Sequence, residues 1–239
     1  MVISGEIRTT ADVDVDKIVK DTIKEIGYNK ANSGIDPDDV EVLSKLHEQS
    51  TEIAQGVDEG SGLHNEQGAG DQGLMFGFAC NETKELMPIP IHLAHRLVER
   101  MTNLRKQNVI SWLRPDSKSQ VSVAYEKGKP ISITKVVIAT QHDDMLNKFE
   151  SEKAEHNFVE SEIIEKVILP VLDECGLPYE KDFIVNGTGR FVFGGPEADT
   201  GLTGRKIIVD TYGGYAPHGG GAFSGKDPSK VDRLSLIHI

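Results

Sequence analysis

Segments with the periodicity of strands alternate along this chain with segments that have the periodicity of helices, and glycine-rich turns separate them. Val2–Ile7 has the character of a short strand. Apolar residues between positions 15 and 26 recur at helical spacing before Gly27, a typical helix stop. Strand character returns at residues 40–46. We therefore expect residues 1 to about 50 to form one β-α-β unit of a layered domain.

The same alternation continues through the rest of the chain. A hairpin is predicted at residues 121–140, where two runs of strand character flank the turn EKGKP. Helices are predicted after Pro90 and at roughly residues 155–169, the second ended by Pro170. Further strands are predicted within residues 68–80, after a turn, and at 182–186, 190–195 and 205–212. The pattern indicates an α+β fold with antiparallel or mixed sheets and helices on one face, rather than a doubly wound parallel fold.

Composition is typical of a soluble globular protein and argues against several functions. Of 239 residues, 38% are hydrophobic and 27% charged, and 38 acidic against 26 basic residues give a net charge of −12. That charge argues against a general binder of nucleic acid or of anionic membranes. Two cysteines cannot form a disulfide framework, and no apolar run approaches the ~18 residues of a membrane span. Since no secretory signal is visible, we expect a cytoplasmic protein that binds neither nucleic acid nor membrane.

The segment GGGAFSGKDPSKVDR, residues 219–233, carries the strongest chemical signal in the chain. Its three glycines let backbone N–H groups approach an anion closely, and Lys226 and Lys230 add cationic donors. Asp227 and Asp232 supply oxygen ligands suited to Mg²⁺. The segment nearly fits the nucleotide-binding pattern GxxxxGK[ST], but Asp227 stands where that pattern needs a hydroxyl. It is either a site for polyphosphate with its metal ion or a glycine loop with solvated charges.

Other candidate residues have plain structural alternatives. Asp71, between glycines in GAGDQG, suits a metal or a ribose as well as an Asx turn that caps a strand. Lys118 is expected at the mouth of a strand, where it binds an anion or is simply solvated. His92 and His95 share a helix face, but without a third nearby ligand we reject a zinc site. Residues 55–67 form either an active-site lid or a linker.

Five segments together match one family in order and spacing. The chain resembles the S-adenosylmethionine synthetases, also called methionine adenosyltransferases, from about Met1 to Arg233. The co-occurrence of the segments is far more specific than any one of them. The matching segments are GAGDQGLMFGFA from Gly68, WLRPDSKSQV from Trp112, GRFVFGGP from Gly189, GLTGRKIIVDTYGG from Gly201 and GGGAFSGKDPSKVDR from Gly219.

The resemblance implies an enzyme fold and a reaction. In that reaction the sulfur of L-methionine attacks C5′ of ATP and expels the whole triphosphate, which is then hydrolysed to pyrophosphate and phosphate. Two Mg²⁺ ions and one K⁺ assist. A neutral thioether needs no general base, so positioning and charge stabilisation of the leaving triphosphate lower the barrier. Family members are homodimers or homotetramers whose active sites lie at the subunit interface.

The resemblance also assigns residues in this chain. Those expected to act in catalysis on the polyphosphate are Lys118, Arg205, Lys226 and Lys230. Those expected to bind ATP are Asp116, Ser117, Lys118, Arg190, Phe191, Asp199, Arg205, Lys206, Ala222 and Lys226, with Phe191 stacking on adenine. Those expected to hold methionine are Glu6, Gln55, Asp199 and Lys230. Asp71 and Asp232 match acidic positions that bind metal or substrate.

The resemblance implies a division of the chain and two departures from the family. We expect the remainder of an N-terminal domain at 1–56, a flexible active-site loop at 57–67, a central domain at 68–193, the start of a C-terminal domain at 194–233 and a tail outside the family pattern at 234–239. The family's HPDK segment, with its catalytic histidine, is missing. We therefore expect a fragment that is inactive alone. The alternatives are a non-catalytic partner subunit and a different ATP-dependent phosphotransferase.

Overall fold

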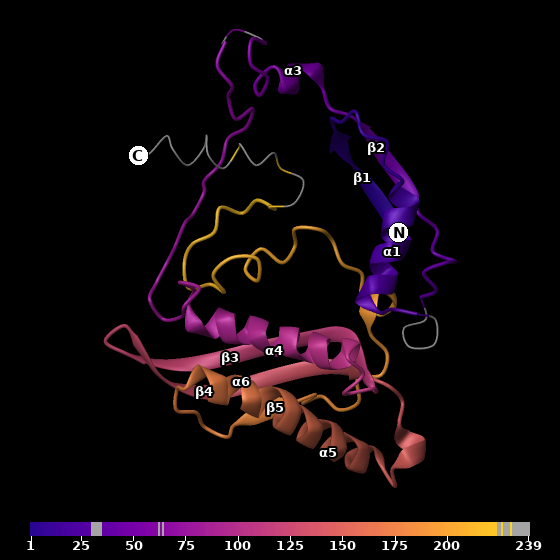
Figure 1. Ribbon diagram of the computed structural model, residues 1–239, viewed down its shortest axis with the longest axis vertical. Helices are drawn as coiled ribbons and strands as arrows, with labels where there is room; N and C mark the ends of the chain where they lie inside the picture. The colour runs from indigo at the N-terminus through magenta and orange to yellow at the C-terminus, as the bar shows by residue number, and fades with distance from the viewer. Residues whose placement is uncertain (30–34, 62, 64, 224–225, 227–229, 231–239) are drawn as a thin grey trace. The chain divides into compact units, whose positions relative to one another are not determined.

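The computed structural model describes residues 1–29, 35–61, 63, 65–223, 226 and 230, and the chain divides into two compact units. Unit 1 comprises Met1–Thr22, Asp38–Gly77 and Leu202–Ile239, and unit 2 comprises Ile23–Pro37 and Phe78–Gly201. Figure 1 labels the helices and strands of both. Among the described residues, none of the helices has the length and apolar character needed to cross a membrane.

Unit 1 contains a small parallel sheet. Strand β1 (Val2–Ile7) pairs with β2 (Leu43–Glu48) in parallel, and the helix α1 (Val15–Ile26) lies between them in sequence. This confirms the predicted β-α-β order, although β2 begins and ends later than residues 40–46. A short helix, α3 (Thr51–Ala54), follows β2, and the hydroxyl of Ser50 accepts a hydrogen bond from the Glu52 N–H at its start.

Unit 2 is built on a three-stranded mixed sheet. Strand β3 (Leu113–Glu126) pairs antiparallel with β4 (Lys129–His142), and β4 pairs in parallel with β5 (Phe183–Val185). The turn between β3 and β4 places Lys127 and Gly128 at φ of +50° and +76°, as a two-residue hairpin turn requires. The predicted hairpin is confirmed, with longer strands than expected, as is the strand at 182–186.

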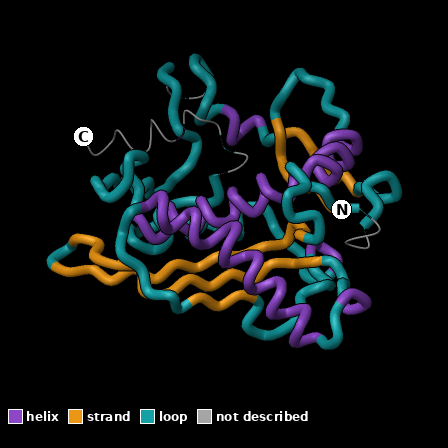
Figure 2. Tube along the Cα trace, turned by 60° about the horizontal axis from the view of Figure 1, so that its bottom comes forward, coloured by secondary structure: helices purple, strands orange, loops and turns teal. Residues whose placement is uncertain are grey.

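Helices pack on this sheet and form the main core with it. They are α4 (Ile89–Lys106), α5 (Glu152–Ile163), a π-helical segment (Ile164–Ile168) and α6 (Leu169–Cys175), and Figure 2 shows them beside the three strands. Short 3₁₀ turns occur at Leu146–Lys148 and Gly195–Glu197. The apolar faces of these elements meet in one cluster of buried side chains that includes Leu97, Ile133, Ile138, Ile163 and Leu172. The α+β class is confirmed.

Pro170 does not end the helix that precedes it, contrary to the prediction. The five residues Ile164–Ile168 form a π-helical segment, so the chain enters α6 with Pro170 in the first helical turn. A proline is tolerated there because its missing N–H needs no partner in that turn. The helical path therefore continues to Cys175, where Gly176 at φ +75° ends it.

Three predicted strands are wrong. Residues 68–80, 190–195 and 205–212 form no strand in the structure. At 205–212 local bonds replace sheet pairing, since Asp210 N donates to Lys206 O at 2.9 Å and the Thr211 hydroxyl donates to Ile207 O at 2.8 Å. At 190–195, side chains of β4 satisfy the backbone, because the Gln141 amide donates to Val192 O at 3.0 Å.

Candidate active site

Unit 1 contains a carboxylate flanked by two lysines. Asp71 follows Gly70, which has φ +60°, and the Gln72 N–H donates to Asp71 Oδ1 at 2.7 Å. Lys230 Nζ lies 3.5 Å from Asp71 Oδ2. The Gln72 N–H lowers the pKa of Asp71 most, and the charges of Lys230 and Lys226 lower it further. Asp71 and Lys230, 159 residues apart in sequence, are therefore brought together around an ionised carboxylate.

In the glycine segment 219–221, a side chain would clash with the backbone at Gly219 and with the end of a lysine side chain at Gly221, whereas Gly220 has open space. A Cβ at Gly219 would lie 2.1 Å from Leu74 O, and one at Gly221 would lie 2.9 Å from Lys226 Nζ. A Cβ on Gly204 would likewise lie only 2.3 Å from the methyl group of Ala222. Gly219, Gly221 and Ala222 line a pocket of about 590 Å³ together with residues 72–77, 211, 212, 217, 218, 223 and 226. Glycine backbone therefore forms part of the wall of this pocket.

The other predicted residues of unit 1 lie apart from that group. Arg205 and Lys206 are exposed on a turn, Glu6 is exposed on β1 opposite His47, and Gln55 caps the end of α3. Among the described residues, none of these four forms a hydrogen bond or ion pair with Asp71, Lys226 or Lys230. Asp227 and Asp232 lie outside the described residues.

In unit 2, Asp116 and Ser117 are held at one end of β3. Asp116 Oδ2 accepts from Gly195 N at 2.8 Å, and Ser117 Oγ lies 2.8 Å from Thr140 Oγ1 on β4. Gly195 has φ +73°, and a Cβ there would lie 2.7 Å from the Tyr28 ring. Burial raises the pKa of Tyr28, and the Asp116 charge adds to that effect. Asp116 therefore holds the turn at Gly195 in place through its hydrogen bond to the Gly195 N–H.

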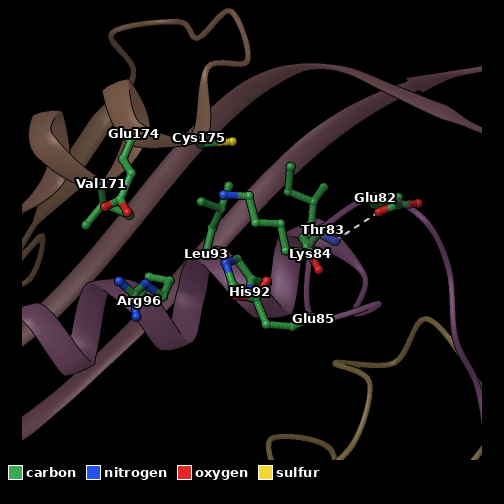
Figure 3. Close-up of a pocket in the computed structure, with 11 residues that line it drawn as sticks. Glu82, Thr83, Lys84, Glu85, His92, Leu93, Arg96, Val171, Glu174 and Cys175 are labelled. Carbon is green, nitrogen blue, oxygen red and sulfur yellow. Dashed lines mark hydrogen bonds and ion pairs between the residues drawn. The ribbon is translucent and has the colours of Figure 1, made fainter.

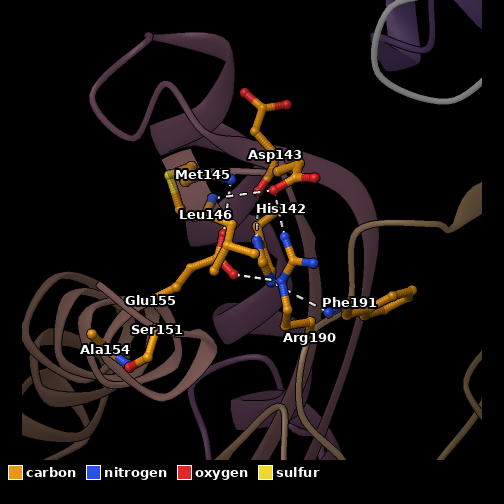
Figure 4. A network of polar contacts seen from close by, with 10 residues as sticks. His142, Asp143, Met145, Leu146, Ser151, Ala154, Glu155, Arg190 and Phe191 are labelled. Carbon is orange, nitrogen blue, oxygen red and sulfur yellow. Dashed lines mark hydrogen bonds and ion pairs between the residues drawn. The ribbon is translucent and has the colours of Figure 1, made fainter. Parts of the chain in front are cut away.

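Arg190 and Phe191 lie beside the end of β4 (Figure 4). Arg190 Nε donates to Glu155 Oε2 at 2.6 Å, and Arg190 Nη2 donates to Asp144 Oδ1 at 2.5 Å. The hydrogen bond to Glu155 is the main reason that the pKa of Arg190 is raised. The N–H of Phe191 donates to His142 Nε2 at 3.3 Å, and the carbonyl of Phe191 accepts from His142 N at 3.0 Å.

Two predicted residues of unit 2 are exposed. Lys118 pairs with Ala139 in the β3–β4 ladder, and because side chains alternate along a strand it points away from the face used by Ser117. Asp199 follows the 3₁₀ turn, and its N–H donates to Gly195 O at 3.1 Å. Neither carboxylate nor ammonium is engaged in the network around Arg190, so both groups remain accessible to a ligand.

Sequence reasoning missed the residues that hold Arg190. Glu155 is fully buried, and its position one helical turn before Val159 and two before Ile163 places it on the core face of α5. An acidic residue at a core position signals a buried partner, because Asp and Glu are almost never fully buried unless paired. That signal was available in the sequence, but the identity of the partner was not.

A second pocket of about 340 Å³ lies in unit 2 between the segment at the start of α4 and helix α6 (Figure 3). Lys84, His92 and Arg96 line it together with Glu85 and Glu174, and His92 Nδ1 is 3.7 Å from Glu85 Oε2. None of the residues predicted to bind substrate lines this pocket. Within the described ranges, no group of three or more histidine, cysteine, aspartate or glutamate residues is arranged to hold a metal ion.

Fold and site together define an α+β protein in which two lysines lie near an ionised carboxylate. Three family models match the chain: the S-adenosylmethionine synthetase central domain at residues 66–191, the C-terminal domain at 193–238 and the N-terminal domain at 1–51. The central-domain match alone covers more than half of the 239 residues. The chain belongs to the S-adenosylmethionine synthetase family. This membership supports a transferase of the methionine adenosyltransferase type, in a family that acts on ATP and methionine and generally uses Mg²⁺ and K⁺.

Proposed function

We propose that this chain serves the synthesis of S-adenosylmethionine from ATP and L-methionine, with hydrolysis of the displaced triphosphate to pyrophosphate and phosphate. The observation that carries the proposal is the group formed by Asp71, Lys226 and Lys230 on bare glycine backbone. A triphosphate needs cationic donors, close backbone approach and an oxygen ligand for its metal ion. This group offers all three in one unit.

The chemistry needs charge stabilisation more than proton transfer. A lone pair of the methionine sulfur forms the new bond to C5′, and the C5′–O bond breaks with its electrons going to the triphosphate. The sulfur has no proton to lose, so no base is required. We propose that the positive charges of Lys118, Arg205, Lys226 and Lys230, together with Lys206, stabilise the leaving triphosphate.

The remaining assignments place the two substrates. We propose that Phe191 stacks on adenine, that Asp116, Ser117, Arg190 and Ala222 belong to the ATP site, and that Asp199 serves both substrates. For the amino-acid head of methionine the proposed residues are Glu6, Gln55, Asp199 and Lys230. Asp71 fits a single oxygen ligand for Mg²⁺, and the same is proposed for Asp232. The ions would neutralise triphosphate charge, with two Mg²⁺ and one K⁺ per site.

We also propose that the working enzyme is a cytoplasmic homodimer or homotetramer and that this chain alone is inactive. Large apolar side chains are exposed in both units, with Leu202 and Phe193 69% and 64% accessible, which supports a further protein surface packing there. The sequence contains no HPDK segment. The proposed division remains 1–56, 57–67, 68–193, 194–233 and 234–239.

The proposed function is tested by binding and by product analysis. Calorimetric titration with magnesium triphosphate should show binding that falls about tenfold in Lys226→Ala and in Lys230→Ala, since each substitution removes a charge-assisted contact. Lys45→Ala, an exposed lysine on β2, is the matched control and should bind like the parent chain. Equal affinity in all four proteins would contradict the proposed site.

Product analysis by mass spectrometry uses ATP, methionine, Mg²⁺ and K⁺. S-adenosylmethionine above background would support the reaction and overturn the inactivity of the chain alone. ADP formed without methionine would contradict the proposed function and favour a phosphotransferase. Binding of triphosphate without any adenosyl product is the expected result for this chain by itself.

A further inference from the structure

Glu155 is a buried carboxylate, and each of its two oxygens accepts a hydrogen bond. Among the described residues it is the one buried side chain of the Asp, Glu, Lys and Arg types. It lies in the first turn of α5, where the Ser151 hydroxyl accepts from Ala154 N at 3.2 Å. Its Oε1 accepts from Met145 N at 2.8 Å and its Oε2 accepts from Arg190 Nε at 2.6 Å. Burial of an ion is costly unless it is paired, so this carboxylate strongly favours one position of Arg190.

The guanidinium of Arg190 is already engaged by acidic residues. Besides Glu155, Asp144 accepts from its Nη2 at 2.5 Å, so carboxylates occupy two of the three nitrogens. In Figure 4 the planar group of Arg190 lies beside Glu155 and His142, with dashed lines to its carboxylate partners. A phosphate would have to compete with two carboxylates for these donors and would meet their negative charge. The side chain of Arg190 therefore suits a structural clamp better than a phosphate contact.

The residue after the clamp is fixed through its backbone. Both the N–H and the carbonyl of Phe191 are bonded to His142, at 3.3 Å and 3.0 Å. Arg190 is anchored by its side chain and Phe191 by its backbone, on the two sides of one planar peptide bond. These anchors fix the path of the backbone and therefore the direction of the Cα–Cβ bond of Phe191. In Figure 4 the ring of Phe191 points away from Glu155 and from the guanidinium.

We infer that Glu155 is a positioning residue for the nucleoside part of the substrate, acting through the Arg190 side chain on the orientation of Phe191. Arg190 thereby contributes to nucleotide binding as an internal clamp and not by binding phosphate. This inference rests on the proposed function, in which Phe191 stacks on adenine. Asp144 is the outer half of the same clamp, and its side chain is 62% exposed.

The test compares three probes that differ in which part of ATP they contain: adenosine, magnesium ATP and magnesium triphosphate. In Glu155→Gln, calorimetry should show the same loss of affinity, about tenfold, for adenosine and for ATP, and no change for triphosphate. Gln retains an oxygen that can accept from Met145 N but presents an amide to Arg190 Nε. Glu152→Gln, an exposed change on the same helix, is the control and should bind all three like the parent chain.

Each other outcome is decisive. A loss seen with ATP and triphosphate but not with adenosine would mean that Arg190 binds phosphate, which overturns the inference and leaves the proposed function intact. A parent chain that binds none of the probes would overturn both. If Glu155→Gln loses the emission of Trp112, the single tryptophan, whose ring lies 6.5 Å from that of His142, it is misfolded. In that case Asp144→Asn is used instead. Its affinities for adenosine and for ATP should fall equally, by less than about tenfold, whereas a loss of affinity confined to ATP would contradict the inference.

Discussion

Units 1 and 2 differ in how their candidate site residues are held. In unit 2, Asp116, Ser117, Arg190 and Phe191 are fixed by hydrogen bonds to neighbouring elements around a large apolar core. Among the described residues of unit 1, Val19 is the one aliphatic or aromatic residue whose side chain is buried. Its candidate residues lie mainly on exposed turns.

The difference separates two ways of building a binding site. A preorganised group binds without the cost of ordering its side chains, whereas an exposed side chain such as that of Lys226 loses conformational freedom when a ligand arrives. Under the proposed function, the prearranged groups of unit 2 would bind the rigid nucleoside. Unit 1 would bind the highly charged triphosphate, whose strong electrostatic attraction would offset the ordering. Three experiments test this difference between the two units.

The largest expected effect is in the core of unit 2. Leu97 on α4 is completely buried, so Leu97→Ala should lower the free energy of unfolding by about 3 to 5 kcal/mol through lost burial and a residual cavity. The matched change in unit 1, Leu74→Ala, removes a side chain that is 64% exposed and should cost less than about 1 kcal/mol. Denaturant titration followed by circular dichroism measures both. Similar losses in the two variants would contradict the difference in packing between the units.

Two glycines with similar backbone conformation allow the cost of a glycine-to-alanine substitution to be divided into backbone strain and steric clash. Gly60 in unit 1 and Gly195 in unit 2 have nearly the same φ, +72° and +73°. A Cβ on Gly60 meets nothing within 4 Å, so Gly60→Ala should cost about 1 kcal/mol from strain alone. A Cβ on Gly195 would lie 2.7 Å from the Tyr28 ring, so Gly195→Ala should cost about 2 to 3 kcal/mol.

Hydrogen exchange of amides near each glycine provides the measurement, because it reports local as well as global opening. The Asp116 to Gly195 N hydrogen bond offers a direct reporter in unit 2. If Gly60→Ala proves as costly as Gly195→Ala, the loop of unit 1 is packed more tightly than the structure indicates.

The smallest effects concern two carboxylates with lowered pKa, one in each unit. A local backbone N–H is the main cause in both, that of Gln72 for Asp71 and that of Leu146 for Asp144, with Lys230 and Arg190 as further contributors. Since the folded pKa lies below the unfolded value, each contribution to stability is complete above the unfolded pKa and is lost as the pH falls through the folded pKa.

NMR titration of the carboxyl carbons should show Asp71 losing its charge below the usual range for aspartate. Lys230→Ala should raise the pKa of Asp71 partway, leaving it still lowered because the Gln72 N–H remains. The same substitution should leave Asp144 unchanged, which makes Asp144 the internal control. A full return of Asp71 to its ordinary pKa in Lys230→Ala would mean that the lysine, and not the backbone, governs this carboxylate.

Features that depend on neighbours within a few residues were predicted from the sequence. The hairpin at Leu113–His142, the strand Phe183–Val185 and the helix Val15–Ile26 follow from side-chain period and turn residues. The strand predicted at 190–195 failed because side chains of β4, Gln141 and His142, occupy its backbone groups. Pro170 failed as a stop because a π-helical segment shifts its place in the helix.

In the candidate site, too, local features were predictable and long-range pairings were not. Glycine and lysine spacing singled out Asp71, Lys226 and Lys230 as chemistry-bearing residues. No local pattern contained the pairing of Glu155 with Arg190, 35 residues away, or of Asp144 with Arg190, 46 residues away.

The local elements, the glycine-rich segments and the residue types proposed to bind a polyphosphate follow from the sequence alone. Those properties depend on interactions between residues close along the chain. The tertiary structure alone decided that Arg190 is held by two carboxylates and that Asp71 meets Lys230 across 159 residues of sequence. Such pairings exist only in the folded chain, because they join residues far apart in sequence. The buried carboxylate of Glu155 in particular requires a partner for its charge.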